Sequence, residues 1–269
     1  MCPSLIPCSG SRRAKAGGVT YLRGVKRKAK NIIIEKVRIE DHAGEGKCLA
    51  RVDGKVIFVE AVVPGDLVDL HITRSKKDWA EGRVMAYREY ASDRIPPFCE
   101  HFGICGGCQW QMLPYPKQLR YKQKQVADTL GRIGKIPLPE VLPIIGADEQ
   151  RYYRNKIEYT FGNKQYLTAE AIKDPLQSAY ADVAGFHARG FFDKVVDIGQ
   201  CHLQREPSNK IRKLIKSFCL REGWPFYDIR MHTGYIRTLQ LRICRTGECM
   251  ANRSPRRSSW NRNSRRIRR

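Results

Sequence analysis

The sequence lacks any long apolar run. No stretch of its 269 residues approaches the roughly 20 consecutive apolar residues that a membrane-spanning helix needs. The opening residues, MCPSLIPCSGSRRAKAGG, also lack the apolar core of a secretory signal. We therefore expect a cytoplasmic protein with no membrane partner, and we expect it to be a monomer.

Acidic residues are missing from both ends of the chain. Residues 1–30 contain eight Lys and Arg, residues 249–269 contain eight Arg, and neither segment has an Asp or Glu. These two segments therefore carry +16 of the formal net charge of +23, which leaves +7 for the residues between them. A mildly basic globular part suits a polyanion such as nucleic acid. We expect residues 1–30 to be disordered.

Residues 31–90 are predicted to form a small β-barrel. The segment CLARVDGKVIFVEAVV contains two apolar runs joined at Asp53-Gly54, a strong signal for a two-residue hairpin. In DLVDLHITR, Val68, Leu70 and Ile72 alternate with polar residues, which indicates one buried face. About five short strands in 60 residues favour an OB-like barrel, with an SH3-like barrel as the alternative.

Residues 91–248 are predicted to mix helices and strands. YPKQLRYKQKQVADTLGRIGK has Pro116 at the start of a helix and Gly134 at its end. SNKIRKLIKSFCLREG predicts a second helix with Ser208 as its N-cap. Its predicted apolar face consists of Ile211, Leu214, Ile215, Phe218 and Cys219.

No strand-like periodicity follows Glu248, although YIRTLQLRIC before it alternates as a strand does. A half-buried strand needs a neighbour to cover its edge. We therefore expect an incomplete domain that stops at Glu248. The tail, residues 249–269, is either a basic RNA-binding arm or an aberrant end, and the abruptness of the change favours the second.

Three cysteines occur within ten residues of FCEHFGICGGCQWQ, at Cys99, Cys105 and Cys108. Ten cysteines in a cytosolic chain argue for metal binding by some of them rather than for disulfides. Cys201 is the best fourth candidate, because it follows a strand-like run and lies in a polar turn. Four thiolates suit zinc or an iron–sulfur cluster, and the three-plus-one spacing on a Gly-rich loop places the cluster modestly ahead of zinc.

Candidate RNA contacts are basic residues that lie near aromatic ones or in the predicted barrel. Basic and aromatic side chains together suit single-stranded RNA, but a solvated strand face is equally compatible with each residue. The candidates are Lys55, Arg74, Lys76, Lys77, Arg151, Arg154, Lys156 and Lys164.

The segment CEHFGICGGCQWQMLPYPKQLRYKQ resembles the signature of the iron–sulfur RNA (uracil-5-)-methyltransferases, which methylate uridine in large-subunit (23S) ribosomal RNA. GEGKCLARVDGKVIFVEAVVPGDLV is similar to the TRAM domain of that family, and YRNKIEYTFG and GFHARGFFDKVVDIGQCHLQ resemble its central domain. The resemblance covers residues 31–248. It implies a structural [4Fe-4S] cluster on Cys99, Cys105, Cys108 and Cys201, S-adenosylmethionine as methyl donor, and RNA as partner.

No apolar strand of the sequence leads into a Gly-x-Gly turn of the kind that cradles a nucleotide cofactor. The expected fold class is therefore mixed β and α+β. It comprises an OB-like TRAM barrel (31–90), then an iron–sulfur loop with a partial α+β central domain (91–248). The resemblance implies that methyl transfer occurs in a C-terminal Rossmann-like domain, and we expect that domain to be absent. We assign no catalytic residue and expect no methyl transfer by the chain alone.

Two other functions remain open at this stage. One is a non-catalytic RNA-binding module with a four-cysteine zinc or iron–sulfur site. The other, with less support, is a radical S-adenosylmethionine enzyme, whose C-x3-C-x2-C spacing differs from the C-x5-C-x2-C spacing found in this chain.

Overall fold

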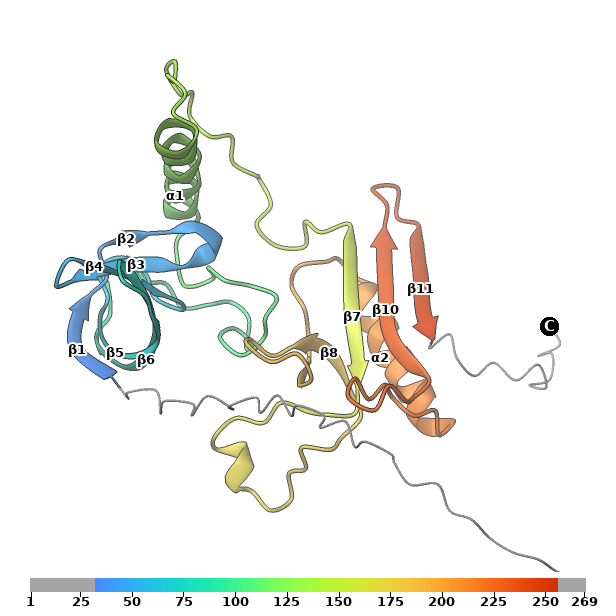
Figure 1. Ribbon diagram of the computed structural model, residues 1–269. Coiled ribbons are helices and arrows are strands. Elements are labelled where there is room, and N and C mark those ends of the chain that lie inside the picture. The colour runs from blue at the N-terminus through green and yellow to red at the C-terminus, as the bar shows by residue number, and fades with distance from the viewer. Residues whose placement is uncertain (1–31, 256–269) are drawn as a thin grey trace, which may run out of the picture. The chain divides into compact units, whose positions relative to one another are not determined.

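The computed structural model describes residues 32–255. The predicted disorder of residues 1–30 and the end of the basic tail lie outside the described residues. The described chain contains two β-sheets and two α-helices (Figure 1). None of the helices described is both long and apolar enough to cross a bilayer.

The first sheet occupies the predicted barrel region and has the strand order β1-β5-β6-β4-β3-β2. The strands are β1 (Ile32–Arg38), β2 (Asp41–His42), β3 (Cys48–Val52), β4 (Lys55–Val59), β5 (Leu67–Ser75) and β6 (Trp79–Glu89), with a short 3-10 turn η1 (Gly44–Gly46). Neighbouring strands are antiparallel except for β4 and β6, which are parallel. The predicted hairpin is confirmed, because β3 and β4 pair across Asp53 and Gly54 with φ values of 51° and 77°.

The second sheet has the strand order β11-β10-β7-β8-β9, and all its pairings are antiparallel. The strands are β7 (Lys156–Gly162), β8 (Val183–His187), β9 (Val195–Asp197), β10 (Ile236–Ile243) and β11 (Cys249–Pro255), with a 3-10 turn η3 (Ala171–Lys173) before β8. Helix α2 (Ser208–Arg221) lies against this sheet (Figure 1). The fully buried residues Tyr159, Phe161 and Leu239 share one core with Cys219 of α2.

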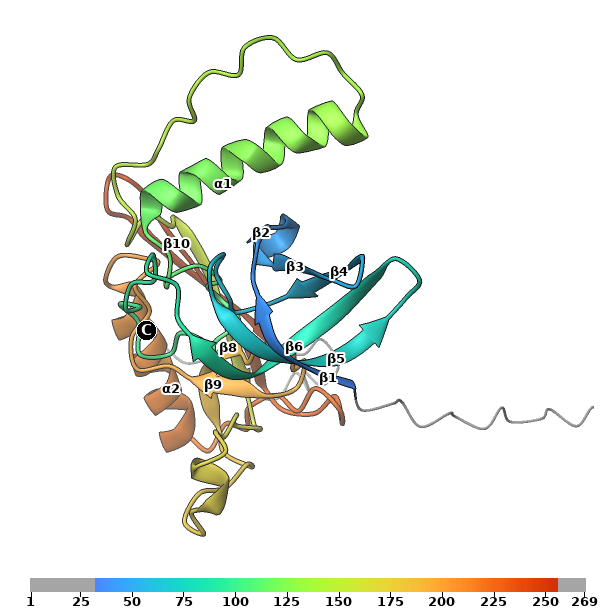
Figure 2. The same ribbon diagram turned by 90° about the vertical axis from the view of Figure 1, so that its left-hand side faces the viewer.

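Helix α1 (Tyr115–Asp128) follows the cysteine-rich loop and continues into a π-helical turn, η2 (Thr129–Ile133). Pro116 lies in the first turn and Gly134 follows the last, as predicted. The chain then returns alongside the helix (Figure 2). Here Gln123 binds Leu142 O and the Ile144 amide at 3.3 and 3.0 Å. These bonds fix the long connection that leads to β7.

The predicted end of the fold at Glu248 is wrong. Strand β11 pairs with β10, and the paired residues run from Cys249 opposite Ile243 to Pro255 opposite Ile236. The second sheet therefore continues into the segment that we expected to be aberrant or disordered. The side chains of residues 249–253 are exposed, so the strand has no apolar alternation to reveal it. An edge strand needs only backbone pairing on one side. The expected partial α+β domain that stops at Glu248 is therefore corrected to a five-stranded sheet that extends to Pro255, and strands outnumber helices among residues 32–255.

Candidate metal centre and nucleic-acid interface

The four predicted ligand cysteines meet at one small cavity. Cys99, Cys105 and Cys108 come from the loop before α1, and Cys201 comes from the turn before α2. All four line a cavity of about 20 Å³. The apolar residues that complete its wall are Phe98, Phe186, Ile198 and Leu203. The structure therefore brings together residues that are far apart in the sequence, and it surrounds them with apolar side chains.

The cysteine loop is fixed to the end of β8 by its backbone. The Gly106 amide donates to His187 O at 3.0 Å. A Cβ atom added at Gly106 would lie 2.9 Å from the same oxygen, so this close approach requires glycine. The next amide, that of Gly107, donates to Cys105 Sγ at 3.4 Å. An N–H group directed at a cysteine sulfur stabilises the thiolate form that ligates metals.

Cys201 is held by a single side chain of α2. Asn209 Oδ1 accepts a hydrogen bond from the Cys201 amide at 2.8 Å, and Asn209 Nδ2 donates to Cys201 O at 3.1 Å. Two residues earlier, the Gly199 amide donates to His101 Nε2 at 3.2 Å. His101 Nδ1 lies 4.0 Å from Cys99 Sγ. His101 therefore links the turn that contains Cys201 to the cysteine loop. It lies beside the candidate ligands and is not counted among them.

Burial favours the protonated form of the thiols in the protein alone. It raises the pKa of Cys201 to about 11, and it also raises the pKa of Cys99 and of Cys105. Binding to a metal centre removes the thiol protons. Zinc and iron–sulfur clusters are both commonly held by four cysteine thiolates. Within residues 32–255, no group of three or more His, Cys, Asp or Glu side chains has the geometry to hold a single metal ion. The metal site therefore stays a prediction.

Four of the predicted RNA contacts form one group where β5 turns into β6. Lys55 Nζ donates to Ser75 Oγ at 3.1 Å, and the guanidinium of Arg74 lies 5.1 Å from the centre of the Trp79 ring. This sheet-end basic group consists of Lys55, Arg74, Lys76 and Lys77. Basic side chains beside an indole suit phosphate contacts combined with base stacking.

The other four predicted RNA contacts do not form one group. Arg151 and Arg154 precede β7 and line a hollow of about 710 Å³, and Lys156 begins the strand. Lys164 follows the opposite end of β7, roughly 20 Å away for a strand of this length. Its Nζ lies 3.8 Å from Asp228 Oδ2, so Lys164 already contacts a carboxylate of this chain.

The 710 Å³ hollow is lined mainly by three segments that the sequence analysis did not associate. Most of its residues come from the cysteine loop, from α1 and from the chain before β7, and Glu45, Gly46 and Leu203 complete the lining. Trp110, Tyr115 and Lys122 belong to it and were missed as candidate contacts. Trp110 Nε1 donates to Gly46 O at 3.3 Å, which fixes the indole. No sequence signal marks these residues, because their proximity depends on how the three segments fold together.

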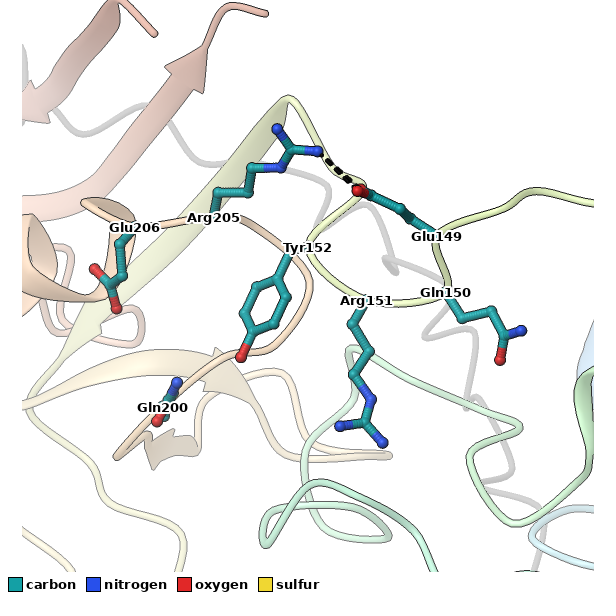
Figure 3. Close-up of a pocket in the computed structure, with 7 residues that line it drawn as sticks. All are labelled: Glu149, Gln150, Arg151, Tyr152, Gln200, Arg205 and Glu206. Atoms are coloured by element: carbon teal, nitrogen blue, oxygen red, sulfur yellow. Dashed lines mark hydrogen bonds and ion pairs between the residues drawn. The ribbon is translucent and has the colours of Figure 1, made fainter.

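A second hollow of about 630 Å³ shares residues 149–151 with the first (Figure 3). In this hollow Arg205 binds both carboxylate oxygens of Glu149, at 2.8 and 3.1 Å. Tyr152 also lines it and has φ 57°, which is uncommon for an aromatic residue. Tyr152 is held there by His202, because its amide donates to His202 O at 2.8 Å and its hydroxyl lies 3.0 Å from His202 Nδ1. Tyr152 therefore connects the hollow to His202, the residue that follows Cys201.

Comparison with known proteins gives a domain and a set of relatives. Residues 34–85 match the TRAM domain, as the resemblance predicted. An RNA methyltransferase from Bacteroides thetaiotaomicron is 47% identical over 208 residues, which are 77% of this chain and 46% of the relative. An RNA methyltransferase from Porphyromonas gingivalis is 42% identical over 219 residues, with 80% and 47% covered. The chain thus spans about half the length of the curated relatives it matches.

A solved structure extends the similarity to the fold. The tRNA (uracil-54, C5)-methyltransferase of Pyrococcus abyssi, in complex with S-adenosyl-L-homocysteine, aligns with a TM-score of 0.54 and 24% identity. The alignment covers 82% of this chain and 45% of that chain. The expected fold class, a partial α+β domain without methyltransferase fold, is therefore wrong, because most of this chain shares its fold with a methyltransferase. The chain therefore contains a TRAM domain, and over more than three quarters of its length it is similar to about half of a bacterial RNA methyltransferase.

Proposed function

We propose that this protein takes part in the S-adenosylmethionine-dependent methylation of C5 of a uridine in RNA, and that the RNA is 23S ribosomal RNA. The observation that carries the proposal is the 47% identity with an RNA methyltransferase over 77% of the chain. The methyl donor is supported by the structural neighbour, which holds S-adenosyl-L-homocysteine, the product that remains after methyl transfer. The choice of uracil C5 is supported by the name of that neighbour and by the cysteine signature.

We further propose that Cys99, Cys105, Cys108 and Cys201 hold a [4Fe-4S] cluster. The proposal is supported by their shared cavity, its apolar wall and the Gly107 amide directed at a cysteine sulfur. When bound, the cluster would link the loop before α1 to the turn before α2, and its contribution would be to stabilise the RNA-binding part. The residues of this chain would supply the thiolates, exclude water from them and fix the backbone of the fourth ligand.

RNA would contact the chain at two places. The sheet-end basic group lies on the TRAM domain, and the family match supports a role for it. Arg151, Arg154 and Lys156 lie at the start of β7, where the larger hollow adds Trp110 and Tyr115 as stacking surfaces. Lys164 remains a proposed contact, but RNA would have to compete with Asp228 for it.

Disruption of the gene in the source cell, followed by mass spectrometry of its RNA, tests the proposed reaction. The expected result is the loss of 5-methyluridine at one position of 23S ribosomal RNA. Loss of the modification only from transfer RNA would contradict the ribosomal substrate. An unchanged set of 5-methyluridines would contradict the reaction and would favour a non-catalytic RNA-binding module.

The activity of the isolated chain is a separate prediction. Purified protein is expected to bind RNA but to transfer no label from methyl-labelled S-adenosylmethionine to a uridine-containing RNA. Detectable 5-methyluridine in that incubation would refute the prediction of inactivity without affecting the proposed reaction.

A further inference from the structure

Helix α2 buries polar side chains against the core, where an amphipathic helix ordinarily buries apolar ones. Ser208, Asn209 and Arg212 are 0%, 3% and 1% exposed, whereas Leu214 of the same helix is 70% exposed. The polar residues occupy one face at i, i+1 and i+4. This face must therefore be matched by specific partners in the protein, because buried polar groups are costly without them.

The partner of Asn209 is the backbone of Cys201. The amide side chain satisfies both the N–H and the C=O group of this one residue, at 2.8 and 3.1 Å. It thereby fixes the backbone of the proposed fourth ligand through two bonds to that residue itself. Glu206 Oε1, 3.1 Å from Asn209 Nδ2, orients the amide.

Arg212 is a buried cation with carbonyl oxygens as its partners. Its Nη1 donates to Ala184 O and its Nη2 donates to Gly199 O, each at 3.0 Å, and its guanidinium lies 5.3 Å from the centre of the Tyr159 ring. Nε has no hydrogen-bond partner. Among the residues that the structure describes, no carboxylate pairs with Arg212. Asp197, which accepts from the Ala184 amide, is instead paired with Lys216 at 2.6 Å.

A second arginine near the cysteines has a different environment. Arg189 Nη2 donates to Cys108 O at 2.7 Å, and its Nη1 lies 3.9 Å from Glu60 Oε2. Arg189 thus has a carboxylate within reach, and Arg212 has carbonyl dipoles and an aromatic face. A charge buried without a counterion is strongly unfavourable, and carbonyl dipoles offset only part of its cost.

A negative charge near the Gly199–Cys201 turn would complete the environment of Arg212. Four thiolates give an iron–sulfur cluster a net negative charge, and Cys201 lies two residues from the carbonyl that Arg212 binds. We propose that Asn209 and Arg212 are positioning residues for the cluster. Asn209 fixes the backbone of its fourth ligand, and Arg212 provides the buried positive charge that balances it. This inference rests on the proposed [4Fe-4S] cluster.

Four substitutions in the full chain test the proposal. Asn209→Leu removes both bonds to Cys201. Arg212→Gln removes the charge, and Arg212→Lys keeps the charge with fewer N–H donors. Lys213→Met is the matched control, because it removes a positive charge from an exposed position of the same helix. Each protein is purified without oxygen, and iron and acid-labile sulfide are measured together with the rate of cluster loss to a chelator and the midpoint potential.

Asn209→Leu and Arg212→Gln are expected to lose the cluster about 10- to 100-fold faster than the wild-type protein, as is usual for residues that support metal ligands. The midpoint potential is expected to become more negative in Arg212→Gln, because a lost positive charge disfavours the added electron. Arg212→Lys and Lys213→Met are expected to keep the wild-type potential. A change in protein packing alone would not separate Arg212→Gln from Arg212→Lys in this way.

Several results would overturn the proposal. Wild-type rates of cluster loss in Asn209→Leu would remove the role of Asn209. A wild-type potential in Arg212→Gln, or a lowered potential in Arg212→Lys, would remove the charge role of Arg212, and the second result can be obtained even if Arg212→Gln does not fold. Wild-type protein without iron and sulfide would instead overturn the proposed cluster itself, so the two failures are distinguishable.

Discussion

Removal of the carboxylate of Asp66 is expected to destabilise the first sheet and to loosen the chain that leads to the cysteine loop. The Asp66 side chain is fully buried and binds Arg94 through both oxygens, with distances of 2.9 to 3.2 Å. It also accepts the Val63 amide at 2.8 Å and the Ala91 amide at 2.9 Å. This one carboxylate therefore ties the turn before β5 to the segment that follows β6.

The expected loss in the free energy of unfolding follows from the burial of Asp66 and Arg94. Removal of one member of a buried ion pair costs about 3–5 kcal/mol. The Arg94 side chain is 20% exposed, so water offsets part of its loss, and we expect Asp66→Asn to lower the free energy of unfolding by about 3 kcal/mol. At roughly 2–4 °C for each kcal/mol in a protein of this size, the melting temperature should fall by roughly 6–12 °C.

Urea unfolding followed by circular dichroism measures this change. The control is Glu89→Gln, which removes the partner of Arg38 in an ion pair whose side chains are 54% and 59% exposed. An exposed pair contributes about 0–1 kcal/mol, so the control should be nearly unchanged. Equal midpoints for Asp66→Asn and Glu89→Gln would show that the buried carboxylate has no special role and would refute the reasoning.

Three further predictions concern RNA, the cysteines and acid. Replacement of all four residues of the sheet-end basic group by Gln should make the dependence of RNA affinity on salt weaker. The negative slope of log affinity for single-stranded RNA against log salt should become shallower by about 3, and an unchanged slope in filter binding would contradict the contact. Cys108→Ser should lower iron content, the urea midpoint and RNA affinity together, whereas loss of iron at full stability would argue against a structural cluster. Hydrogen bonds from the Met231 amide and Asn163 help to lower the pKa of Asp228 from 3.8 to about 2. Because the folded-state pKa is the lower one, the stabilisation is present above about pH 4 and is lost as the pH falls toward 2. The urea midpoints of wild type and Asp228→Asn should therefore converge in acid, and a constant difference between pH 7 and pH 3 would contradict this pH dependence.

Local signals in the sequence predicted local structure well. The Asp53-Gly54 turn needs two residues with positive φ, and few dipeptides other than this one supply them, so the hairpin could be predicted from two letters. The same applies to α1, where Pro116 and Gly134 have clear positional preferences. The proximity of Cys201 to the three loop cysteines was predictable because a four-thiolate site would need a fourth cysteine and Cys201 lies in a polar turn after a strand-like run.

The buried face of α2 could not be predicted from its apolar pattern. Cys219 is buried as predicted, but Leu214 is exposed and Arg212 is buried. Ser208 does not cap the helix, because its hydroxyl instead bonds the buried Tyr159 hydroxyl at 2.9 Å. Buried polar side chains depend on partners from distant segments, and a hydrophobic pattern carries no information about those partners.

Strand β11 was missed for a different physical reason. Periodicity reports the burial of side chains, and β11 is an edge strand held by backbone pairing with β10 and by Arg253, whose guanidinium lies over the rings of Trp224 and Tyr235. The segment CMANRSP carries neither the alternation nor the β-branched residues that identify a strand. The expectation that the fold stops at Glu248 confused a lack of side-chain burial with a lack of structure.

The central claim is that Cys99, Cys105, Cys108 and Cys201 hold an iron–sulfur cluster. It is tested most directly by iron, zinc and acid-labile sulfide analysis, with the visible spectrum, of protein purified without oxygen. We predict about four iron and four sulfide per chain with a broad absorption band, lost in Cys201→Ser and retained in Cys244→Ser, whose cysteine is exposed and outside the cavity. A colourless protein with one zinc per chain, or a cluster that survives Cys201→Ser, would contradict the account.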